Sequence, residues 1–323
     1  MTASRDQYPT YDELKAFEDT GERSSWGVFG ADDQIGSINF LTEDVIVQAA
    51  AEIRLGRCVN LDLPVGEPKD PFWSSRSAPV RTETVNRTSR DDRLDNFYLQ
   101  GGSQWDALRH HRYRQHGYYG GRQDDDVDDG QLLGIDRWAT RGIVGRGVLL
   151  DVAGYLSSQG TALSPTERFL IGSDLIEEIA KAQSIDFRAG DILLVRTGWL
   201  SWYQTLTDEQ RRARAAEFQA DRRSLKLPGI DPRVPTVAWI WNHRIAAMAT
   251  DTPTFDALEF RREDGWAHQR LLALLGLAIG ELWDLDQLAE TCAELDRYTF
   301  FLTSSPINLP EGAGSPPNAY AIF

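Results

Sequence analysis

Cysteine is scarce in this chain: Cys58 and Cys292 are the two that occur among 323 residues. Two cysteines so far apart cannot provide a disulfide framework, and they lack the close spacing of a zinc site. The sequence therefore excludes a small domain stabilised by disulfides or by structural zinc. Long apolar runs are also lacking, since no stretch approaches the roughly 18 residues that a membrane helix needs. The opening residues carry no apolar core of a signal peptide. We therefore predict a cytoplasmic protein without a membrane partner.

Basic residues are outnumbered, with 34 Lys and Arg against 49 Asp and Glu, for a formal net charge of -15. A surface of this sign repels phosphate backbones, so nucleic acid is excluded as a partner and a small-molecule substrate is expected. The densest acidic run, residues 124–129 (DDDVDD), is predicted to be a solvated loop, with a cation site as the alternative.

Two common signatures of function are absent from the chain. No Gly-x-Ser-x-Gly elbow is present, which argues against a serine hydrolase. The glycine-rich stretches at residues 145–148 and 312–315 lack the fingerprint of a dinucleotide or phosphate loop. Taken alone, each of these glycine-rich stretches indicates a turn and no ligand site.

Strands and helices alternate over the second half of the chain, which predicts an α/β fold. One domain covering residues 1–323 is the simplest account, with residues 1–25 wrapping the surface. The predicted strands are residues 57–65, 145–155, 189–199, 244–253, 298–310 and 318–323.

Helix starts carry the clearest local signals. Thr42 is predicted to be the N-cap of a helix at residues 43–55. Ser164 and Thr207 each begin a capping box and predict two further helix starts. Residues 267–290 are predicted to form a helix, a glycine-containing break and a second helix.

The five histidines are the first place to look for chemistry: His110, His111, His116, His243 and His268. Three of them lie within seven residues, just after a glycine-rich turn. Such a cluster indicates a site, although a solvated surface run is an alternative, above all for His111 and His116.

The stretch before this cluster, residues 100–110 (QGGSQWDALRH), has the spacing of a known metal-binding motif. It resembles the motif His-x-Gly-Thr-His-x-Asp-x-Pro-x-His of the cyclase family, which includes kynurenine formamidases and isatin hydrolases. The matching positions are Gln100, Gly102, Ser103, Gln104, Asp106, Leu108 and His110. Further segments resemble the family in the right order: residues 24–46, 134–152, 189–199, 246–259 and 305–323.

This resemblance implies a swivelling β/β/α domain, with a mixed sheet and flanking helices, that assembles into homodimers or homotetramers. It implies hydrolysis of a formamide, a cyclic amide or a lactone with Zn²⁺ or Mn²⁺. In the family, two histidines and the aspartate of the motif hold a metal, the last histidine transfers protons, and a later His and Glu complete the site. His268 and Glu281 fit that later pair.

The chain departs from the motif at the two histidine positions that hold the metal in the family, where Gln100 and Gln104 stand instead. An amide oxygen is a poor substitute for imidazole nitrogen, so we expect a weak or absent metal site. In one account Asp106, His268 and Glu281 hold a single metal and His110 acts as general acid or base.

The other account has no metal. Asp106, His110, His268 and Glu281 carry out acid–base chemistry, and the amides of Gln100 and Gln104 bind a substrate carbonyl or oxyanion. Cyclisation, isomerisation or dehydration then competes with hydrolysis, and a small-ligand-binding protein without turnover is a further alternative. We slightly favour the account with a weak or absent metal.

Several other residues are candidates for the wall of a binding pocket. Trp105 is expected to pack the motif loop, with stacking on substrate as the alternative. Trp26, Phe72 and Trp73 are candidates for the wall of the substrate pocket, with a place in the core or at its rim as the alternative. Asp251, at the end of a predicted strand, is a candidate for substrate binding, with a turn-capping role as the alternative. Residues 66–96, which include Phe72 and Trp73, are predicted to form a long surface excursion of the kind that often carries function.

Overall fold

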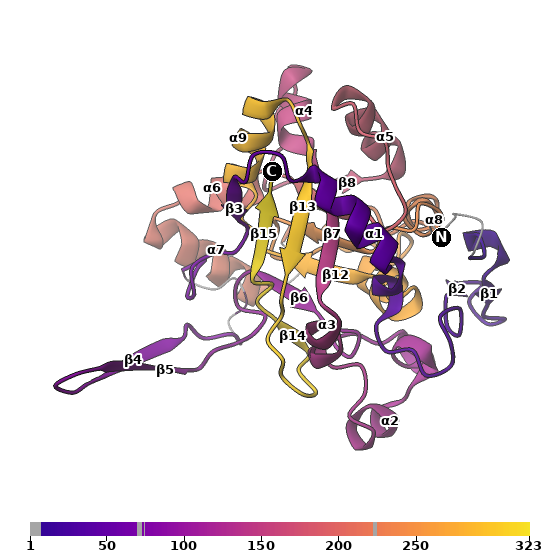
Figure 1. The fold of residues 1–323 in the computed structure, drawn as a ribbon, viewed down its shortest axis with the longest axis horizontal. Helices are drawn as coiled ribbons and strands as arrows, with labels where there is room; N and C mark the ends of the chain where they lie inside the picture. The colour runs from indigo at the N-terminus through magenta and orange to yellow at the C-terminus, as the bar shows by residue number, and fades with distance from the viewer. Residues whose placement is uncertain (1–7, 70–72, 74, 222–224) are drawn as a thin grey trace.

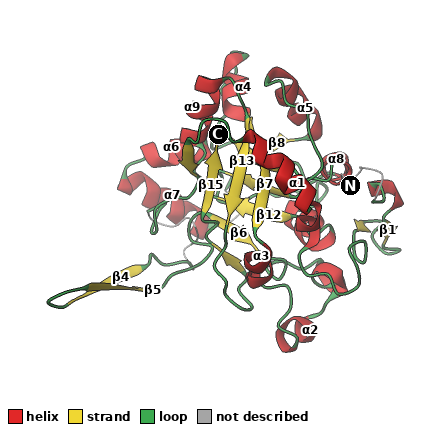
Figure 2. Ribbon diagram, in the orientation of Figure 1, coloured by secondary structure: helices red, strands yellow, loops and turns green. Residues whose placement is uncertain are grey.

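A computed structural model describes residues 8–69, 73, 75–221 and 225–323. Its centre is a nine-stranded mixed sheet in the order β14-β6-β12-β11-β9-β7-β13-β15-β3 (Figure 1). The four central strands, β12, β11, β9 and β7, are parallel, and the strands on both sides of them pair antiparallel. Helices surround this sheet (Figure 2). The predicted mixed α/β sheet with flanking helices is therefore confirmed.

The strands of the large sheet are short, and their bounds are as follows: β3 Cys58–Asn60, β6 Gln104–Asp106, β7 Ile143–Asp151, β9 Ile192–Arg196, β11 Ala247–Thr250, β12 Ala278–Glu281, β13 Thr299–Ser304, β14 Gly314–Ser315 and β15 Ala319–Ile322. Three further two-stranded pairs lie outside it: β1 Lys15–Ala16 with β2 Arg23–Ser24, β4 Val80–Val85 with β5 Arg90–Asp95, and β8 Phe169–Ile171 with β10 Pro228–Ile230.

The α-helices of the described residues are α1 Glu43–Ala49, α2 Asp124–Asp129, α3 Ile135–Arg141, α4 Val152–Ser158, α5 Ser173–Ala182, α6 Trp199–Thr205, α7 Asp208–Ala220, α8 Val234–Asn242 and α9 Asp286–Leu295. A π-helical turn, η7, covers His268–Leu274. Short 3₁₀ turns are η2 Tyr11–Glu13, η3 Gly36–Phe40, η4 Ala50–Glu52, η5 Arg114–His116 and η6 Tyr119–Gly121. Among the described residues, no helix has the length and apolar character needed to cross a bilayer.

Two of the three predicted helix starts are confirmed. The Thr42 hydroxyl accepts a hydrogen bond from the Val45 amide at the start of α1, and Thr207 forms a capping box with Gln210 at the start of α7. The start predicted at Ser164 is wrong. The residues that follow it form a turn and then strand β8, which pairs with β10, so the helix begins only at Ser173.

The prediction for residues 267–290 is wrong in its middle. Between η7 and α9 the chain forms β12, which lies between β11 and β6 in the sheet. A short buried apolar run cannot be assigned to helix or strand by periodicity alone. Glycine is needed at position 280 of this strand because a Cβ there would lie 2.6 Å from Nε1 of Trp283 and 2.7 Å from Cβ of Ala249.

The predicted surface excursion contains the β4–β5 hairpin, which projects away from the sheet (Figure 1). Every residue of both strands is exposed. The acidic run at residues 124–129, predicted to be a loop, forms the short helix α2. Asp124 and Asp128 pair there with Arg112 and Arg109.

The predicted surface-wrapping segment is anchored to the body of the protein through part of its length. Tyr11 and Leu14 are buried, and the Tyr11 amide donates a hydrogen bond of 2.8 Å to Asn242 at the end of α8. Tyr11 belongs to the same hydrophobic cluster as Phe323. One core thus includes side chains from both ends of the described chain.

A buried ion pair links β7 to the entrance of β9. The Arg146 guanidinium donates two hydrogen bonds of 2.8 Å to the Asp191 carboxylate, and both side chains are almost fully buried. Removing one partner of such a pair leaves an uncompensated buried charge.

We therefore expect Arg146→Leu to lower the free energy of unfolding by about 3–5 kcal/mol. Urea denaturation followed by circular dichroism measures this loss. Arg93→Leu removes an exposed arginine from the β4–β5 hairpin and should change stability by less than about 0.5 kcal/mol. An equally small effect of Arg146→Leu would contradict the assigned role.

Candidate functional site

Strand β6 carries the middle of the motif. Side chains alternate between the two faces of a strand, so Gln104 and Asp106 share one face and Trp105 occupies the other. In the antiparallel pairing with β12, Gln104 lies opposite Glu281 and Trp105 opposite Gly280. Glu281 is thus brought to Gln104 by strand register.

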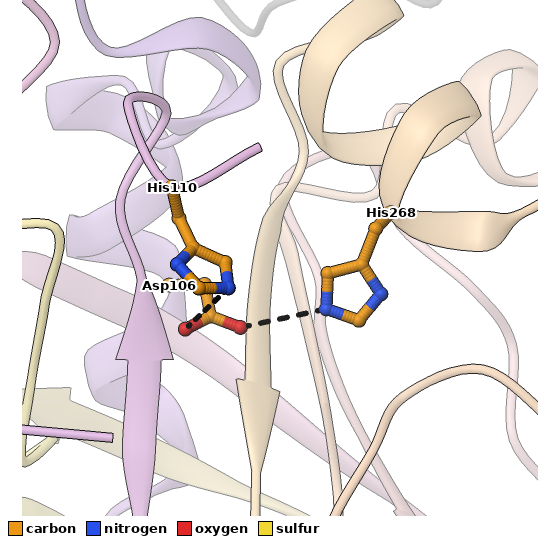
Figure 3. Close-up of side chains that lie close together, drawn as sticks. All are labelled: Asp106, His110 and His268. Atoms are coloured by element: carbon orange, nitrogen blue, oxygen red, sulfur yellow. Dashed lines mark ion pairs between the residues drawn. The ribbon is translucent and has the colours of Figure 1, made fainter. Parts of the chain in front are cut away.

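Asp106 is the centre of the site. Its carboxylate is fully buried, and neither oxygen has a hydrogen-bond partner among the residues that the structure describes. His110 Nε2 lies 3.9 Å from Oδ1, and His268 Nε2 lies 3.6 Å from Oδ2 (Figure 3). Burial raises the pKa of Asp106, but the charges of the two histidines outweigh this effect and hold the pKa below its usual value.

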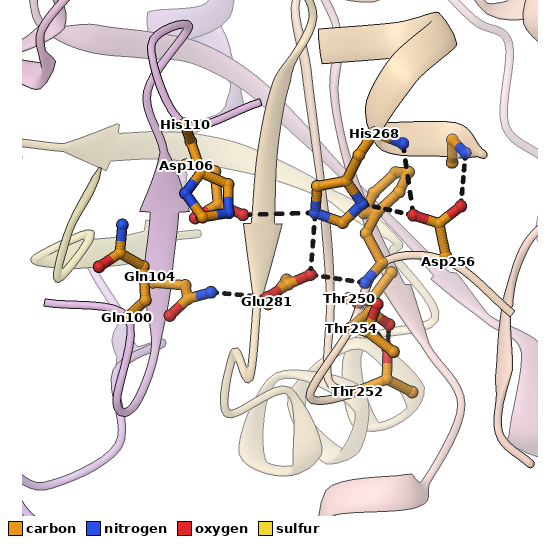
Figure 4. A network of polar contacts seen from close by, with 12 residues as sticks. Gln100, Gln104, Asp106, His110, Thr250, Thr252, Thr254, Asp256, His268 and Glu281 are labelled. Carbon is orange, nitrogen blue, oxygen red and sulfur yellow. Dashed lines mark hydrogen bonds and ion pairs between the residues drawn. The ribbon is translucent and has the colours of Figure 1, made fainter. Parts of the chain in front are cut away.

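His268 begins η7 and lies among three carboxylates (Figure 4). Its Nδ1 contacts the Asp256 carboxylate, which also accepts hydrogen bonds from the backbone amides of Ala267 and His268. Its Nε2 faces Asp106 and lies 3.3 Å from Oε1 of Glu281. Burial lowers the pKa of His268, but the contacts with the three carboxylates outweigh burial and raise the pKa well above its usual value.

Glu281 is held at both of its carboxylate oxygens. Oε2 accepts a hydrogen bond of 2.6 Å from the Gln104 side chain, and Oε1 accepts one of 2.8 Å from the Phe255 amide. The Gln104 side chain therefore lies beside Glu281, and its own oxygen has no partner within the described residues. Figure 4 shows this row of contacts running from Gln104 through Glu281 and His268 to Asp256.

An open cavity of about 180 Å³ exposes part of this cluster. It is lined by Trp73, Arg76, His110, His111, Thr254, Trp266, His268 and Glu281. It lies where β11 and β12 end, and the carboxyl ends of parallel strands are the usual place for a ligand in an α/β sheet. Burial lowers the pKa of His111 to about 4, so this wall residue is neutral at pH 7.

The structure brings together the four residues to which the sequence assigned catalysis: Asp106, His110, His268 and Glu281. His111 joins them at the cavity, whereas His116 pairs with Asp19 elsewhere.

Besides Gln104, which is held beside Glu281, four residues that we predicted to bind substrate lie outside the wall of this cavity. Trp105 is fully buried, packs edge-on against Trp283 and donates a hydrogen bond to Ser304, because its face of β6 points into the core. Trp26 packs against Phe17 and donates to the Ala273 carbonyl. These tryptophans serve the packing of the protein here.

The other two candidates are polar residues. Asp251 accepts hydrogen bonds from the backbone and hydroxyl of Thr197 and from the Gly198 amide, so it caps the turn before α6, and burial raises its pKa to about 6. Gln100 is half-buried, and its backbone carbonyl accepts a hydrogen bond from Arg76. Of the aromatic candidates in the surface excursion, Trp73 lines the cavity and Phe72 lies outside the described residues.

Sequence reasoning missed Asp256, Arg76, Thr254 and Trp266. Asp256 follows β11 in a segment that resembles the family, and it lies 12 residues before His268. An acidic residue just after a predicted strand is a weak sequence signal for a site residue, and Asp256 carries that signal. Trp266 lies two positions before His268, but nothing in the pattern indicates which of the ten tryptophans faces a cavity.

The donors of this cluster fit a divalent metal ion. Ligand atoms of Asp106, His110 and His268 lie within 4.8 Å of one another, and the buried carboxylate of Asp106 lacks a hydrogen-bond partner in the described part of the chain. One oxygen and two imidazole nitrogens suit Zn²⁺ or Mn²⁺. Asp256 on Nδ1 of His268 supplies the carboxylate that commonly orients a metal-binding histidine. The metal ligands predicted from the sequence were Asp106, His268 and Glu281, so that set had Glu281 in place of His110.

Solved structures with the same fold include enzymes and related proteins. The crystal structure of a novel cyclase is 31% identical, covers 93% of this chain and 99% of its own, and superposes with a TM-score of 0.79. Isatin hydrolase A from Labrenzia aggregata is 18% identical over 84% of this chain and 94% of its own, with a TM-score of 0.58. A predicted metal-dependent hydrolase from Bacillus stearothermophilus is 16% identical over 82% and 97%, with a TM-score of 0.50.

No protein of curated function matches the chain. Residues 51–257, however, match the sequence profile of the Cyclase family. This range includes the whole motif at residues 100–110, and the solved cyclase extends the similarity over nearly the full length. The chain belongs to the cyclase family.

Proposed function

We propose that this protein is a hydrolase that opens a small cyclic amide, lactone or formamide at its carbonyl carbon. The observation that carries the proposal is the buried Asp106 carboxylate between two imidazole nitrogens, beside an open cavity. Burying a carboxylate without a hydrogen-bond partner is costly unless a cation compensates it. The isatin hydrolases and the metal-dependent hydrolase that share the fold support hydrolysis as the reaction class.

Asp106 and His268 would hold a divalent ion, with Glu281 beside them and His110 as a further donor within reach. When bound, the ion supplies Lewis-acid polarisation of the substrate carbonyl. Asp256 keeps Nε2 of His268 directed at Asp106, and Gln104 keeps the carboxylate of Glu281 in place.

His110 is the residue to which we assign proton transfer, because its side chain is a quarter exposed and lines the cavity, while Asp106 is fully buried. It accepts a proton from the attacking water as the oxygen adds to the carbonyl carbon. It then returns this proton to the leaving nitrogen or oxygen as the bond to that atom breaks. The products are a carboxylic acid and an amine or alcohol, and His110 ends in its starting state.

A metal-free reaction is the second candidate, because glutamine stands at the two histidine positions of the family motif that hold the metal, Gln100 and Gln104. The Gln104 amide donates to Glu281, so this carboxylate is held without an ion. Asp106, His110, His268 and Glu281 then provide acid–base groups for isomerisation, dehydration or ring closure. The homodimer or homotetramer that the family implies stays a prediction.

The metal content separates the two candidates. We expect protein purified without chelator and without a metal-affinity step to contain about one Zn²⁺ or Mn²⁺ per chain, measured by elemental mass spectrometry. Dialysis against chelator should abolish hydrolysis of a panel of lactones, imides and formamides, and the same ion should restore it. Protein that is free of metal and keeps its activity in chelator would support the metal-free candidate instead.

Two substitutions distinguish residues that hold the metal ion from the residue that transfers the proton. Asp106→Asn should lose both the bound metal and turnover. His110→Ala should keep the metal and lower kcat by about 10²- to 10⁴-fold. His116→Ala, a histidine that pairs with Asp19 away from the cavity, is the matched control and should behave as wild type. Loss of metal from His110→Ala would make His110 a ligand, and undiminished kcat would remove its catalytic role.

Asp256 is expected to act by positioning His268. Asp256→Asn should lower kcat or metal affinity by about 10- to 100-fold, as for other carboxylates behind a metal-binding histidine, with a smaller change in KM. Asp19→Asn alters a comparable carboxylate–histidine pair at the surface and should leave both quantities unchanged. Equal effects of the two substitutions would argue that the Asp256 contact is merely structural.

A further inference from the structure

Arg76 lines the cavity, and no acidic residue of the described part of the chain forms an ion pair with its positive charge. Among the described residues, its hydrogen bond goes to the backbone carbonyl of Gln100, and no carboxylate lies within ion-pair distance of its guanidinium. This is unusual in a chain with a net charge of -15, where many other arginines are paired with acids. A guanidinium has five N–H donors in a planar fork, so most of the donors of Arg76 remain available to a ligand.

One aromatic ring lies beside this charge, and others line the same cavity. The guanidinium carbon of Arg76 lies 5.7 Å from the ring centre of Trp73, and both residues line the cavity. Trp266 lines it as well, with His111 at 6.0 Å between ring centres. Flat aromatic rings beside an oriented guanidinium are suited to a planar molecule that carries an anionic group.

We propose that Arg76 forms an anion subsite, which binds a carboxylate carried by the substrate in addition to the bond that is opened. The substrate class is then a flat ring compound with a free carboxylate, whose ring lies among the tryptophans. This inference rests on the proposed function, because it concerns the same cavity. A fork of guanidinium donors recognises a carboxylate through two parallel hydrogen bonds and fixes the ring relative to the reacting groups.

The competing role for Arg76 is compensation of the buried carboxylates. Arg76 is one of the groups whose positive charge lowers the pKa of Asp106, after His110 and His268. If compensation were its sole role, its loss would affect neutral and anionic ligands alike. An anion subsite has a different signature, since only ligands with a carboxylate lose affinity.

Direct binding tests this without any need for turnover. Isothermal titration calorimetry with benzoate and with benzamide compares two ligands that share a ring and differ in charge. We expect wild-type protein to bind benzoate at least about tenfold more tightly, and Arg76→Gln to lose this preference. Arg76→Lys keeps the charge without the fork and should retain part of it. Arg54→Gln removes an exposed arginine outside the cavity and should bind as wild type.

Two outcomes would overturn the subsite: equal binding of both ligands to wild-type protein, or a preference for benzoate that survives in Arg76→Gln. Circular dichroism confirms that the variant is folded. The kinetic counterpart compares phthalide with phthalide-5-carboxylate, for which Arg76→Gln should raise KM about tenfold only for the acid. If neither lactone, nor any compound of the panel, is hydrolysed while the benzoate preference holds, the proposed function fails and the subsite stands.

Discussion

The need to compensate one buried carboxylate determines how the site is built. Asp106 lies at the end of a core strand with no hydrogen bond to either oxygen from the described residues, so the protein must bring positive charge to it. His110 reaches it from the loop that follows the same strand, and His268 from a helical turn more than 150 residues later. The carboxylates of Asp256 and Glu281 contact the two ring nitrogens of His268 and hold this side chain in place. Each contact in this series depends on the preceding one, and the series begins at the carboxylate of Asp106.

The sheet supplies the precision that this arrangement needs. Antiparallel pairing sets Gln104 against Glu281, and a slip of one residue would turn both side chains to the opposite face. The absence of a side chain at Gly280 lets β12 lie close to Trp105 and Trp283. Tryptophan packing on one face of the sheet thereby sets the position of the polar groups on the other.

Alternating strands and helices predicted an α/β fold, and the resemblance of the motif and of the later His/Glu pair to the cyclase family implied the mixed sheet and the four ionisable residues that the structure brings together. Sequence reasoning could not place β12, since an apolar run buried on both faces has neither helical nor strand periodicity. For Trp105 it expected packing of the motif loop and kept substrate stacking as an alternative; alternation along a three-residue strand sends the side chain into the core, in agreement with packing. Asp256 and Arg76 were missed because their roles arise from tertiary approach to His268 and to the cavity.

The β4–β5 hairpin can vary in sequence and length independently of the strands that carry the site. Its residues make no part of the core, and Arg76 lies only a few positions before its first strand. Insertions or deletions in such an exposed arm cost little folding free energy. The strands that hold the reacting groups, in contrast, tolerate little variation. The hairpin can therefore change in length and composition while the strands that hold the reacting groups keep their positions.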